Sequence, residues 1–438
     1  MILDCAFEFT DLKSFTIPDN LRNFIASAFN NCPISSLNVS PNSRSCCSED
    51  EVIFSKSKKI IFYFPPEKRT YEYRIPDGIR VIESYSLCTK HLQKIYCPQS
   101  VVNIHNKAFE CSSIEYIILE GCDNIKYIGV DAFHGCKVQS LDFRSCKNLT
   151  TILTGTFAGC TQMKFIGLPS SISTIKKRAF ENCNSLVEVA FTDNISNLTY
   201  IESYAFSHTG LQTFNFGPNV SKVTAKAFLF CSSLTSITVS GTNPNFTSVN
   251  GVIYNKQMTK LIIYPAGIRS TSYTVNSNVI AIKKYAFSSC QYLTLVNLPP
   301  KLRKICNFAF ANSALHNITT PDTLTMIQKG AFMNCKNLTI ANINGTYTQL
   351  SENCFRYDHN LTVVYLPQSF ESSPLSSFAN CSSIQCVTYP KNMKERVFMA
   401  GIPWVALSDT NCSKFLPIIE KKHQEYQKWL QNIFRYRY

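Results

Sequence analysis

The stretch of sequence that decides the fold is Met163-Lys-Phe-Ile166-Gly-Leu168-Pro169-Ser-Ser-Ile172-Ser-Thr-Ile175-Lys-Lys-Arg-Ala179-Phe180-Glu-Asn-Cys183. Ile166 and Leu168 are expected to point inward and Gly167 outward, which is the two-residue period of a strand with one buried face. Pro169 ends this strand, because proline has no backbone N–H to donate to a sheet. Apolar residues then recur at wider intervals as far as Phe180, which indicates a second short segment that also faces inward.

The same spacing returns elsewhere in the chain. Residues 293–305 repeat it as Leu293-Thr-Leu-Val296-Asn-Leu298-Pro299-Pro-Lys-Leu302-Arg-Lys-Ile305. A phenylalanine, usually after alanine, marks each repeat, and it recurs about every 23 residues within two runs. We interpret these residues as a structural ladder through the core: Phe109, Phe133, Phe157, Phe180, Phe206, Phe228, Phe287, Phe310, Phe332, Phe355 and Phe378.

A repeat of this kind predicts a solenoid. Each coil buries only one side, so the stacking of coils completes the core and places the strands in a parallel sheet. The chain has 438 residues, of which 45% are hydrophobic and 16% charged, which is too apolar a composition for a disordered chain. Strand centres from Thr16 to Thr388 predict sixteen coils. We predict a solenoid over residues 1–390 and a separate C-terminal segment over residues 391–438.

Two longer gaps between repeats contain an insert. Residues of about 50–66 and 250–266 match each other at an offset of 200, with Pro65 corresponding to Pro265. In each segment, apolar and polar residues alternate on both sides of a polar turn, which is Lys56-Ser-Lys58 in the first and Asn255-Lys-Gln257 in the second. We predict a β-hairpin between coils at each place.

The spacing Leu-x-x-Ile-x-Leu-Pro-x-x-Ile-x-x-Ile-x-x-x-Ala-Phe-x-x-Cys, with an insert that ends at Tyr264-Pro265, resembles the BspA-type leucine-rich repeat proteins over roughly residues 10–390. The period lies within the range of roughly 20–29 residues of leucine-rich repeats. The resemblance implies a mainly β, right-handed leucine-rich repeat solenoid with a parallel sheet and short turns. The better-described family members are surface or secreted proteins that bind host matrix components, other microbes or receptors. The resemblance therefore implies recognition or adhesion at the cell surface, as a surface antigen.

From about residue 391 the repeat stops and the composition changes. Four apolar residues in the segment 415–434 share one helical face, at Tyr426, Trp429, Leu430 and Ile433. We predict that this amphipathic helix caps the exposed end of the core, as a solenoid requires. The alternative is a basic helix that makes a peripheral contact with an anionic membrane surface or a partner's groove.

Eight of the twenty cysteines follow a repeat phenylalanine by three residues: Cys32, Cys136, Cys160, Cys183, Cys231, Cys290, Cys335 and Cys381. One cysteine per coil at an equivalent site predicts small buried residues whose thiols donate weakly to turn carbonyls. Thr209, Ser313 and Asp358 take this position in other coils and are also small and polar. We predict a reduced structural ladder, with disulfides among these eight as the alternative. The sequence does not pair the remaining cysteines.

Several kinds of chemical site are not predicted. A zinc site requires paired ligands such as Cys-x-x-Cys, which this sequence lacks, and its seven histidines are dispersed over different coils. Glycine-rich phosphate loops are also absent. A catalytic triad is defined by geometry and not by sequence order, but no pattern indicates one. We predict no metal, no cofactor and no catalytic residues.

Outward residues at the strand centres form the candidate binding surface. Most are Thr or Asn, which are explained equally well by the solvated face of a strand. The functional alternative is a hydrogen-bonding ribbon for a protein or glycan ligand, with Tyr96, Ile118 and Tyr365 as contact anchors. The candidate binding residues on this sheet face are Arg74, Tyr96, Ile118, Asp142, Asn215, Thr238, Asn297, Thr319, Asn342 and Tyr365.

Positive charge gathers elsewhere. The formal net charge is +14, and stacking is expected to place the basic residues that precede the repeat phenylalanines along one flank. This candidate basic ridge consists of Lys107, Lys176, Lys177, Arg178, Lys226, Lys283, Lys284, Lys304 and Lys329. It either keeps the solenoid soluble or contacts sulfated glycans or an acidic protein. Nucleic acid is not expected, because no stacking aromatic residues alternate with these lysines.

Signals for the compartment disagree. Asp4, Glu8 and Asp11 interrupt the first twenty residues, which therefore lack the pattern of a secretory signal, and no apolar run approaches the roughly 20 residues of a transmembrane segment. These observations favour the cytoplasm, whereas the family resemblance favours the surface. We predict a non-enzymatic scaffold that binds protein or glycan at the cell surface. The alternatives are an intracellular interaction scaffold and an enzyme with an unrecognised site.

Overall fold

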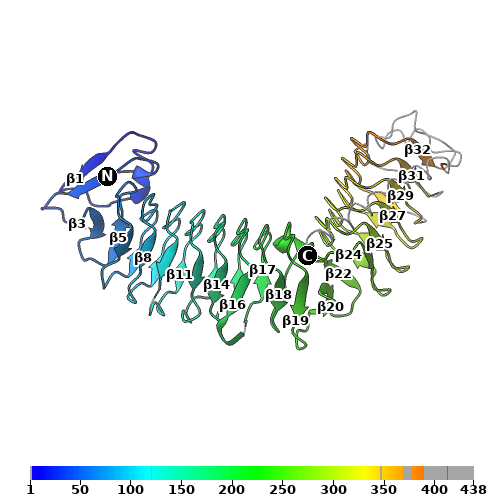
Figure 1. Cartoon of the computed structure of the whole chain (residues 1–438), viewed down its shortest axis with the longest axis horizontal. Coiled ribbons are helices and arrows are strands. Elements are labelled where there is room, and N and C mark those ends of the chain that lie inside the picture. The colour runs from blue at the N-terminus through cyan, green and yellow to red at the C-terminus, as the bar shows by residue number, and fades with distance from the viewer. Residues whose placement is uncertain are drawn as a thin grey trace, which may run out of the picture. The chain divides into compact units, whose positions relative to one another are not determined.

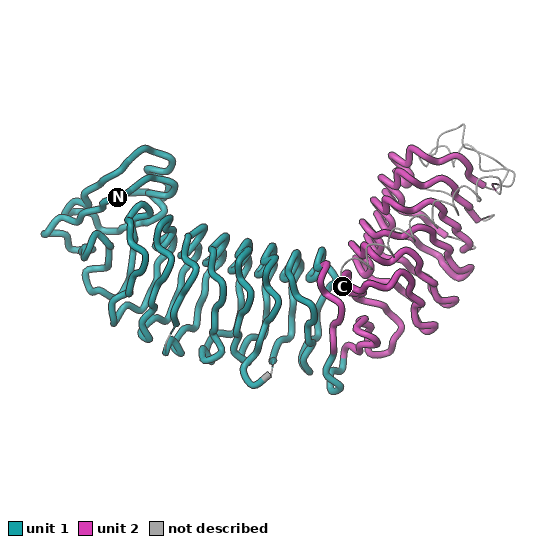
Figure 2. Tube along the Cα trace, viewed as in Figure 1, with its two compact units in different colours: residues 1–231, 239–244 teal, residues 232–238, 245–438 magenta. Residues whose placement is uncertain are grey.

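The computed structural model describes residues 2–119, 121–194, 196–345, 348–367, 374, 376–388 and 412. The chain divides into two compact units (Figure 2): unit 1 is Met1–Cys231 with Val239–Pro244, and unit 2 is Ser232–Thr238 with Asn245–Tyr438. Within each unit, short strands succeed one another as the rungs of a solenoid (Figure 1). The predicted C-terminal cap and its helix, apart from Cys412, lie outside the described residues.

One outward-facing strand marks each coil, and the described residues contain sixteen of them, which confirms the predicted solenoid of about sixteen coils. In unit 1 they are β1 (Ser14–Ile17), β2 (Ser36–Val39), β6 (Glu72–Arg74), β8 (Lys94–Tyr96), β10 (Tyr116–Ile118), β12 (Ser140–Asp142), β14 (Phe165–Leu168), β16 (Glu188–Phe191) and β18 (Thr213–Phe216). The first three residues of β19 (Ser236–Val239) belong to unit 2 and Val239 belongs to unit 1. The other strands of unit 2 are β23 (Ser272–Thr274), β25 (Leu295–Asn297), β27 (Asn317–Thr319), β29 (Ile340–Asn342), β31 (Val363–Tyr365) and β32 (Cys386–Thr388).

These strands pair in parallel, and equivalent residues of successive coils lie opposite one another. The sheet β6-β8-β10-β12-β14-β16 of unit 1 places Ile95 opposite Ile117, for example, and Leu141 opposite Ile166. All four side chains are buried. Because the side chains of a strand alternate between its two faces, the residues on either side of these inward positions face outward.

A second row of two-residue strands runs along each unit, and the second residue of each is a buried isoleucine or leucine. In unit 1 these strands are β7 (Val81–Ile82), β9 (Asn103–Ile104), β11 (Tyr127–Ile128), β13 (Thr151–Ile152), β15 (Thr174–Ile175) and β17 (Tyr200–Ile201). In unit 2 they are β24 (Ala281–Ile282), β26 (Lys304–Ile305), β28 (Met326–Ile327) and β30 (Gln349–Leu350). Helical structure in the described residues is limited to the 3-10 segments η1 (Ala26–Phe29), η2 (Thr192–Asn194) and η3 (Ala225–Phe228).

Both predicted β-hairpins are confirmed, and each has an additional strand. In unit 1, β3 (Cys46–Glu49), β4 (Val52–Ser55) and β5 (Ile60–Tyr63) are antiparallel. In unit 2, β20 (Phe246–Val249), β21 (Val252–Asn255) and β22 (Lys260–Ile263) repeat this arrangement. The last strand of each insert then pairs in parallel with β7 or β24. The strands β3 and β20 are not predicted from the sequence, although Asn250-Gly251, with φ of 51° and 79°, is a strong signal for a two-residue hairpin turn.

The rings of the repeat phenylalanines stack along the core of each unit. The eleven side chains are at most 4% exposed. Within each unit, adjacent ring centroids lie 4.8–5.5 Å apart, and ring planes deviate by 1–14° from parallel. The backbone adds bonds between coils, since the N–H of Phe180 donates to the carbonyl of Ala205 at 2.8 Å. One residue per coil thus supports both the core and the hydrogen bonding between coils.

Left-handed backbone occurs two residues after each stacked ring and, except at Phe228 and Phe378, also two residues before it. Arg178 and Asn182, two residues before and after Phe180, have φ of 59° and 61°. Glycine occupies the equivalent positions around Phe157, at Gly155 and Gly159. Glycine adopts this conformation without strain and asparagine tolerates it better than most residues, which explains why both recur in the turns of the repeat.

Candidate functional site

The candidate sheet face of unit 1 is the outward side of strands β6, β8, β10, β12, β14 and β16. Each strand presents two outward positions, and parallel pairing aligns them in two rows. One row contains the predicted residues Arg74, Tyr96, Ile118 and Asp142, followed by Gly167 and Ala190. The other row is Glu72, Lys94, Tyr116, Ser140, Phe165 and Glu188. These residues are not among the predicted ones, because the prediction includes only the outward residue at each strand centre. The two-residue period of a strand would have identified them.

Aromatic rings and cations meet on this face. The guanidinium carbon of Arg74 lies 4.1 Å from the centroid of the Tyr96 ring, and Lys94 Nζ lies 4.8 Å from the same ring. Tyr116, on the next strand, remains 42% exposed. Cations held over aromatic rings are attracted by about 0.5–1 kcal/mol at exposed sites. On this face, the cations Arg74 and Lys94 are therefore held next to an aromatic ring in the unbound protein.

Asp142 and Arg144 extend this pattern toward β14. Arg144 Nη2 lies 2.6 Å from Asp142 Oδ2, and the hydrogen bonds from Arg144 lower the pKa of the Asp142 carboxyl. Gly167 occupies an outward position but is buried, because the space of a side chain there is taken by Asp142 and Arg144. Arg144 also lies 5.8 Å from the ring centroid of Phe165. Arg144 is not among the predicted binding residues, because it follows its strand instead of lying within it.

The remaining candidate binding residues belong to other strands. Asn215 lies on β18, Thr238 on β19 and Asn297 on β25, and all three are exposed. Thr319 on β27 is exposed, whereas Asn342 on β29 and Tyr365 on β31 are half-buried. In unit 2, Asn297 Nδ2 donates to Thr274 Oγ1 at 3.0 Å. Asn215, Thr238, Asn297, Thr319 and Asn342 thus make the outward side of these strands polar.

A disulfide joins Cys386 to Cys412, two cysteines that the sequence does not pair. Cys386 on β32 pairs with Val363 on β31, on the same side of these strands as Tyr365. Val363, Cys386 and Cys412 form a buried cluster with Ile340 and Tyr365 packed against it. Tyr365 is therefore part of a packed cluster rather than a free contact anchor.

The candidate basic ridge carries acidic groups as well. Four of its residues pair with glutamates: Lys107 with Glu110, Lys176 with Glu202, Arg178 with Glu181 and Lys329 with Glu352, at 2.9–3.3 Å. The backbone N–H of Lys177 donates to Glu202, and Lys226 Nζ lies 5.2 Å from the Tyr204 ring centroid. Lys283, Lys284 and Lys304 lie near Cys306, where their charges oppose the rise in thiol pKa that burial causes. In unit 1 the ridge is thus a surface of mixed charge, which weakens it as an anion-binding site.

The ladder cysteines are buried free thiols. Cys160, Cys183 and Cys231 each donate to the carbonyl of the repeat phenylalanine in the preceding coil, at 2.9–3.0 Å. Burial raises the pKa of Cys136 to about 11 and that of Cys183 to about 12. Because the thiolate is the nucleophilic form of cysteine, these protonated side chains act as packing groups and weak donors.

Asp358 is a carboxyl group among these thiols. Its side chain is fully buried, Oδ1 accepts a hydrogen bond from the Cys335 backbone N–H at 2.7 Å, and Oδ2 has no partner among the described residues. Burial raises the pKa of this carboxyl well above its usual value. The folded state therefore binds the proton of Asp358 more tightly than the unfolded state does. The resulting stability is fully present below about pH 4 and is lost as the pH rises through the folded-state pKa.

We expect Asp358→Asn to increase the free energy of unfolding at pH 8 by about 1–2 kcal/mol, because the amide keeps an acceptor for Cys335 and carries no charge. The difference in the free energy of unfolding between this variant and the wild type should become smaller as the pH is lowered from 8 to 5. Urea denaturation at several pH values measures both effects. Asp142→Asn is the control, because its carboxyl is exposed and ion-paired. An equal difference between Asp358→Asn and wild type at every pH would contradict the explanation.

The histidines and acidic residues do not gather into one site within the described part of the chain. His91, His105 and His134 face Glu67, Glu83 and Glu110 in successive coils. The described residues contain no cluster of three or more His, Cys, Asp or Glu side chains that could hold a metal ion. Within the same residues, no helix has the length and apolar character needed to cross a bilayer.

Comparison with known proteins reveals a family. A family profile described as "BspA type Leucine rich repeat region (6 copies)" matches residues 1–71, 46–164, 150–280 and 280–399. None of the curated proteins matches this chain.

Solved structures provide a second comparison. A leucine rich cell surface protein from Faecalibacterium prausnitzii is 22% identical, with a TM-score of 0.64 over 82% of this chain and 98% of that one. The pneumococcal vaccine antigen PcpA is 20% identical, with a TM-score of 0.61 over 79% of this chain and 87% of the antigen. At these identities the likeness concerns the fold alone.

Proposed function

Since this chain belongs to the family of BspA-type leucine-rich repeat proteins, we propose that it is a non-enzymatic scaffold that binds a protein partner through the candidate sheet face of unit 1. The observation that carries this proposal is the group of aromatic side chains Tyr96, Tyr116 and Phe165 on one sheet face, with Arg74 beside Tyr96 and Arg144 beside Phe165. Tyrosine and arginine are enriched where protein interfaces concentrate their binding energy. The rigid parallel sheet would fix these side chains before binding and so lower the entropic cost of association.

The charges on this face indicate the chemistry of the partner. Arg74 and Lys94 lie over the Tyr96 ring. An apolar group of a partner that packs near Tyr96 would therefore have these two cations beside it. We infer a protein surface with an apolar centre and carboxylates at its rim. The paired Asp142 and Arg144 would order the opposite side of the patch without adding a large net charge.

Photo-crosslinking tests the location of this interface. With p-benzoylphenylalanine in place of Tyr116, we expect one dominant protein adduct on the producing cells or on their host tissue. Tyr127 provides the control, because it is 40% exposed and lies on β11 of the second row. Equal adducts from both positions, or none from Tyr116, would exclude the candidate sheet face.

Once the partner is purified, single substitutions measure the energetic contribution of the face. Tyr96→Ala is expected to weaken binding at least tenfold, as for an interface residue worth about 1.4 kcal/mol or more. Tyr127→Ala should leave the affinity unchanged. Unchanged affinity of Tyr96→Ala would show that the aromatic side chains of the candidate sheet face do not make the contact.

We further propose that binding occurs at the cell surface, as recognition or adhesion. The Cys386–Cys412 disulfide supports an oxidising compartment, and the similar F. prausnitzii protein is named as a cell surface protein. Protease treatment of intact cells tests this location. Loss of the full-length protein without lysis is expected, whereas complete protection would favour the intracellular scaffold.

A further inference from the structure

The first insert interrupts the regular packing of coils in unit 1. In an ordinary coil, the repeat phenylalanine is followed by a turn that ends in the ladder cysteine or its small replacement. In the insert, Phe64 takes over the backbone bond of the repeat phenylalanine, since its N–H donates to the carbonyl of Ser86 at 2.8 Å. Two prolines follow it, and neither has a backbone N–H to continue such a turn. A cavity of about 380 Å³ lies at this place.

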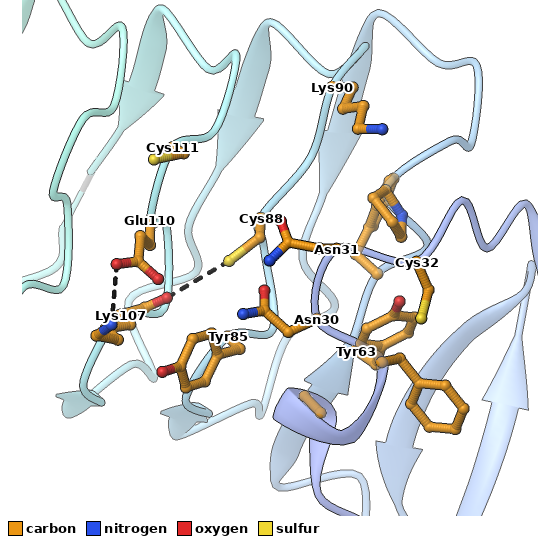
Figure 3. A pocket seen from close by; sticks show the side chains of 14 residues that line it. Asn30, Asn31, Cys32, Tyr63, Tyr85, Cys88, Lys90, Lys107, Glu110 and Cys111 are labelled. Atoms are coloured by element: carbon orange, nitrogen blue, oxygen red, sulfur yellow. Dashed lines mark hydrogen bonds and ion pairs between the residues drawn. The ribbon is translucent and has the colours of Figure 1, made fainter. Parts of the chain in front are cut away.

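Four segments of unit 1 line the cavity (Figure 3). Asn30, Asn31 and Cys32 come from the turn after η1, whereas Tyr85 and Cys88 come from the coil after the insert. Lys107, Glu110 and Cys111 belong to the following coil, and Tyr63 lies at the end of β5. The volume falls at the lower end of the roughly 300–1,000 Å³ range of small-molecule sites. It suits a single ring-sized unit better than a long chain.

Tyr63 supplies the polar group that marks this cavity as a binding site. Its side chain is 3% exposed, and its hydroxyl makes no hydrogen bond to any described residue. Burial, with added effects from Cys32 and Cys88, raises the pKa of this hydroxyl, so it remains a neutral donor and acceptor. A buried hydroxyl without a partner destabilises a fold by about 1–3 kcal/mol. A ligand hydroxyl at the end of the cavity would remove that penalty.

Charge and ring chemistry limit the class of ligand. The two lysines of the lining are paired, Lys107 with Glu110 at 3.0 Å and Lys90 with Glu67, so the cavity has little excess charge to attract a phosphate or carboxylate. The Lys107 ammonium lies 5.4 Å from the Tyr85 ring centroid and fixes that ring at the wall. An aromatic ring, carboxamides and a phenol together match a sugar ring, which has an apolar C–H face and several hydroxyls.

We propose that this cavity binds a neutral pyranose unit of a glycan, with Tyr63 bonded to one sugar hydroxyl, Asn31 to a second and Tyr85 against the ring. The sugar site lies apart from the candidate sheet face, and its test does not depend on a protein partner. The second insert has isoleucine at the position that corresponds to Tyr63, Ile263. The proposal is therefore specific to the first insert.

Ligand-observed saturation-transfer NMR on the full chain tests the proposal. The probes are methyl α-glucoside, methyl β-galactoside, methyl α-mannoside and methyl N-acetyl-β-glucosaminide at millimolar concentration, with glucose 6-phosphate as the charged probe. At least one neutral probe is expected to bind, and glucose 6-phosphate more weakly or not at all. Absence of binding by all four neutral probes, or preferred binding of the phosphate, would overturn the proposal.

Two variants tie the binding to the cavity. Tyr63→Phe should lower the affinity for the best-binding neutral probe about three- to tenfold, which is the contribution of one hydrogen bond. The melting temperature of this variant should stay equal or rise, because a buried hydroxyl without a partner among the described residues is removed. Asn31→Gly should also weaken binding, and glycine accommodates the φ of 56° at that position. Tyr264→Phe is the matched control, since it removes another buried unpartnered hydroxyl in unit 2. Unchanged affinity of Tyr63→Phe, or an equal loss in Tyr264→Phe, would refute the site.

Discussion

Phe180→Ala is expected to lower the free energy of unfolding of unit 1 by about 3–5 kcal/mol, the usual range for a buried phenylalanine truncated to alanine. The ring is fully buried between Phe157 and Phe206, with centroids 5.3 Å and 5.2 Å away. Its loss leaves a cavity between two coils that the backbone hydrogen bonds on either side prevent from collapsing. Because each coil contacts chiefly its neighbours, the damage should also weaken the coupling between the coils on its two sides.

Urea denaturation followed by far-ultraviolet circular dichroism measures this effect, and hydrogen exchange locates it. The expected result is a lower midpoint, with the earliest loss of protection in the coils that contain Phe157, Phe180 and Phe206. Phe9→Ala serves as the control, because Phe9 is 78% exposed and should change stability by less than about 0.5 kcal/mol. Comparable losses from both variants would mean that the stacked rings do not carry the stability assigned to them.

Removal of the Cys386–Cys412 disulfide is expected to destabilise the end of unit 2 by about 3 kcal/mol. The bond closes a loop with a sequence separation of 26, and a crosslink of this length restricts the unfolded chain by roughly that amount. It also keeps Cys412 against Val363 and Ile340. The double variant Cys386→Ser with Cys412→Ser should therefore expose these side chains and increase the binding of a hydrophobic dye.

Peptide mapping without reduction should first recover a linked pair of peptides that contain Cys386 and Cys412. Stability is then compared with the variant Cys5→Ser, which removes an exposed free cysteine and should behave as the wild type. If both cysteines react with iodoacetamide in the native oxidised protein, the disulfide is not formed. If the double variant is as stable as the wild type, the loop does not contribute as described.

Much of the architecture follows from short-range patterns. The interval between Phe157 and Phe180 predicts one coil, because an identical turn has to return to the same place in the next layer. The alternation at Ile166 and Leu168 predicts which strand face is buried. The similarity of Val52 and Val252 likewise predicts two inserts. The turn at Asn250-Gly251 and the additional strand of each insert are not part of that prediction.

The candidate site was predictable only in part. Arg74, Tyr96, Ile118 and Asp142 follow from the strand period, and the structure brings them together in one sheet. Lys94, Tyr116 and Phe165 follow from the same period applied to the second outward position. Arg144 does not, because its role depends on the absence of a side chain at Gly167 in the following coil.

The sequence by itself determined the repeat, the buried ladder and the sixteen coils, because these depend on residues close together in one coil and on their recurrence in the next. Only the tertiary structure decided that Cys386 pairs with Cys412, that basic residues of the ridge meet glutamates, and that a cavity opens beside Tyr63. The physical reason is that each of these features depends on the distance between side chains in different coils. Small changes in the backbone path of a turn alter these distances, and a local pattern of residues does not predict such changes.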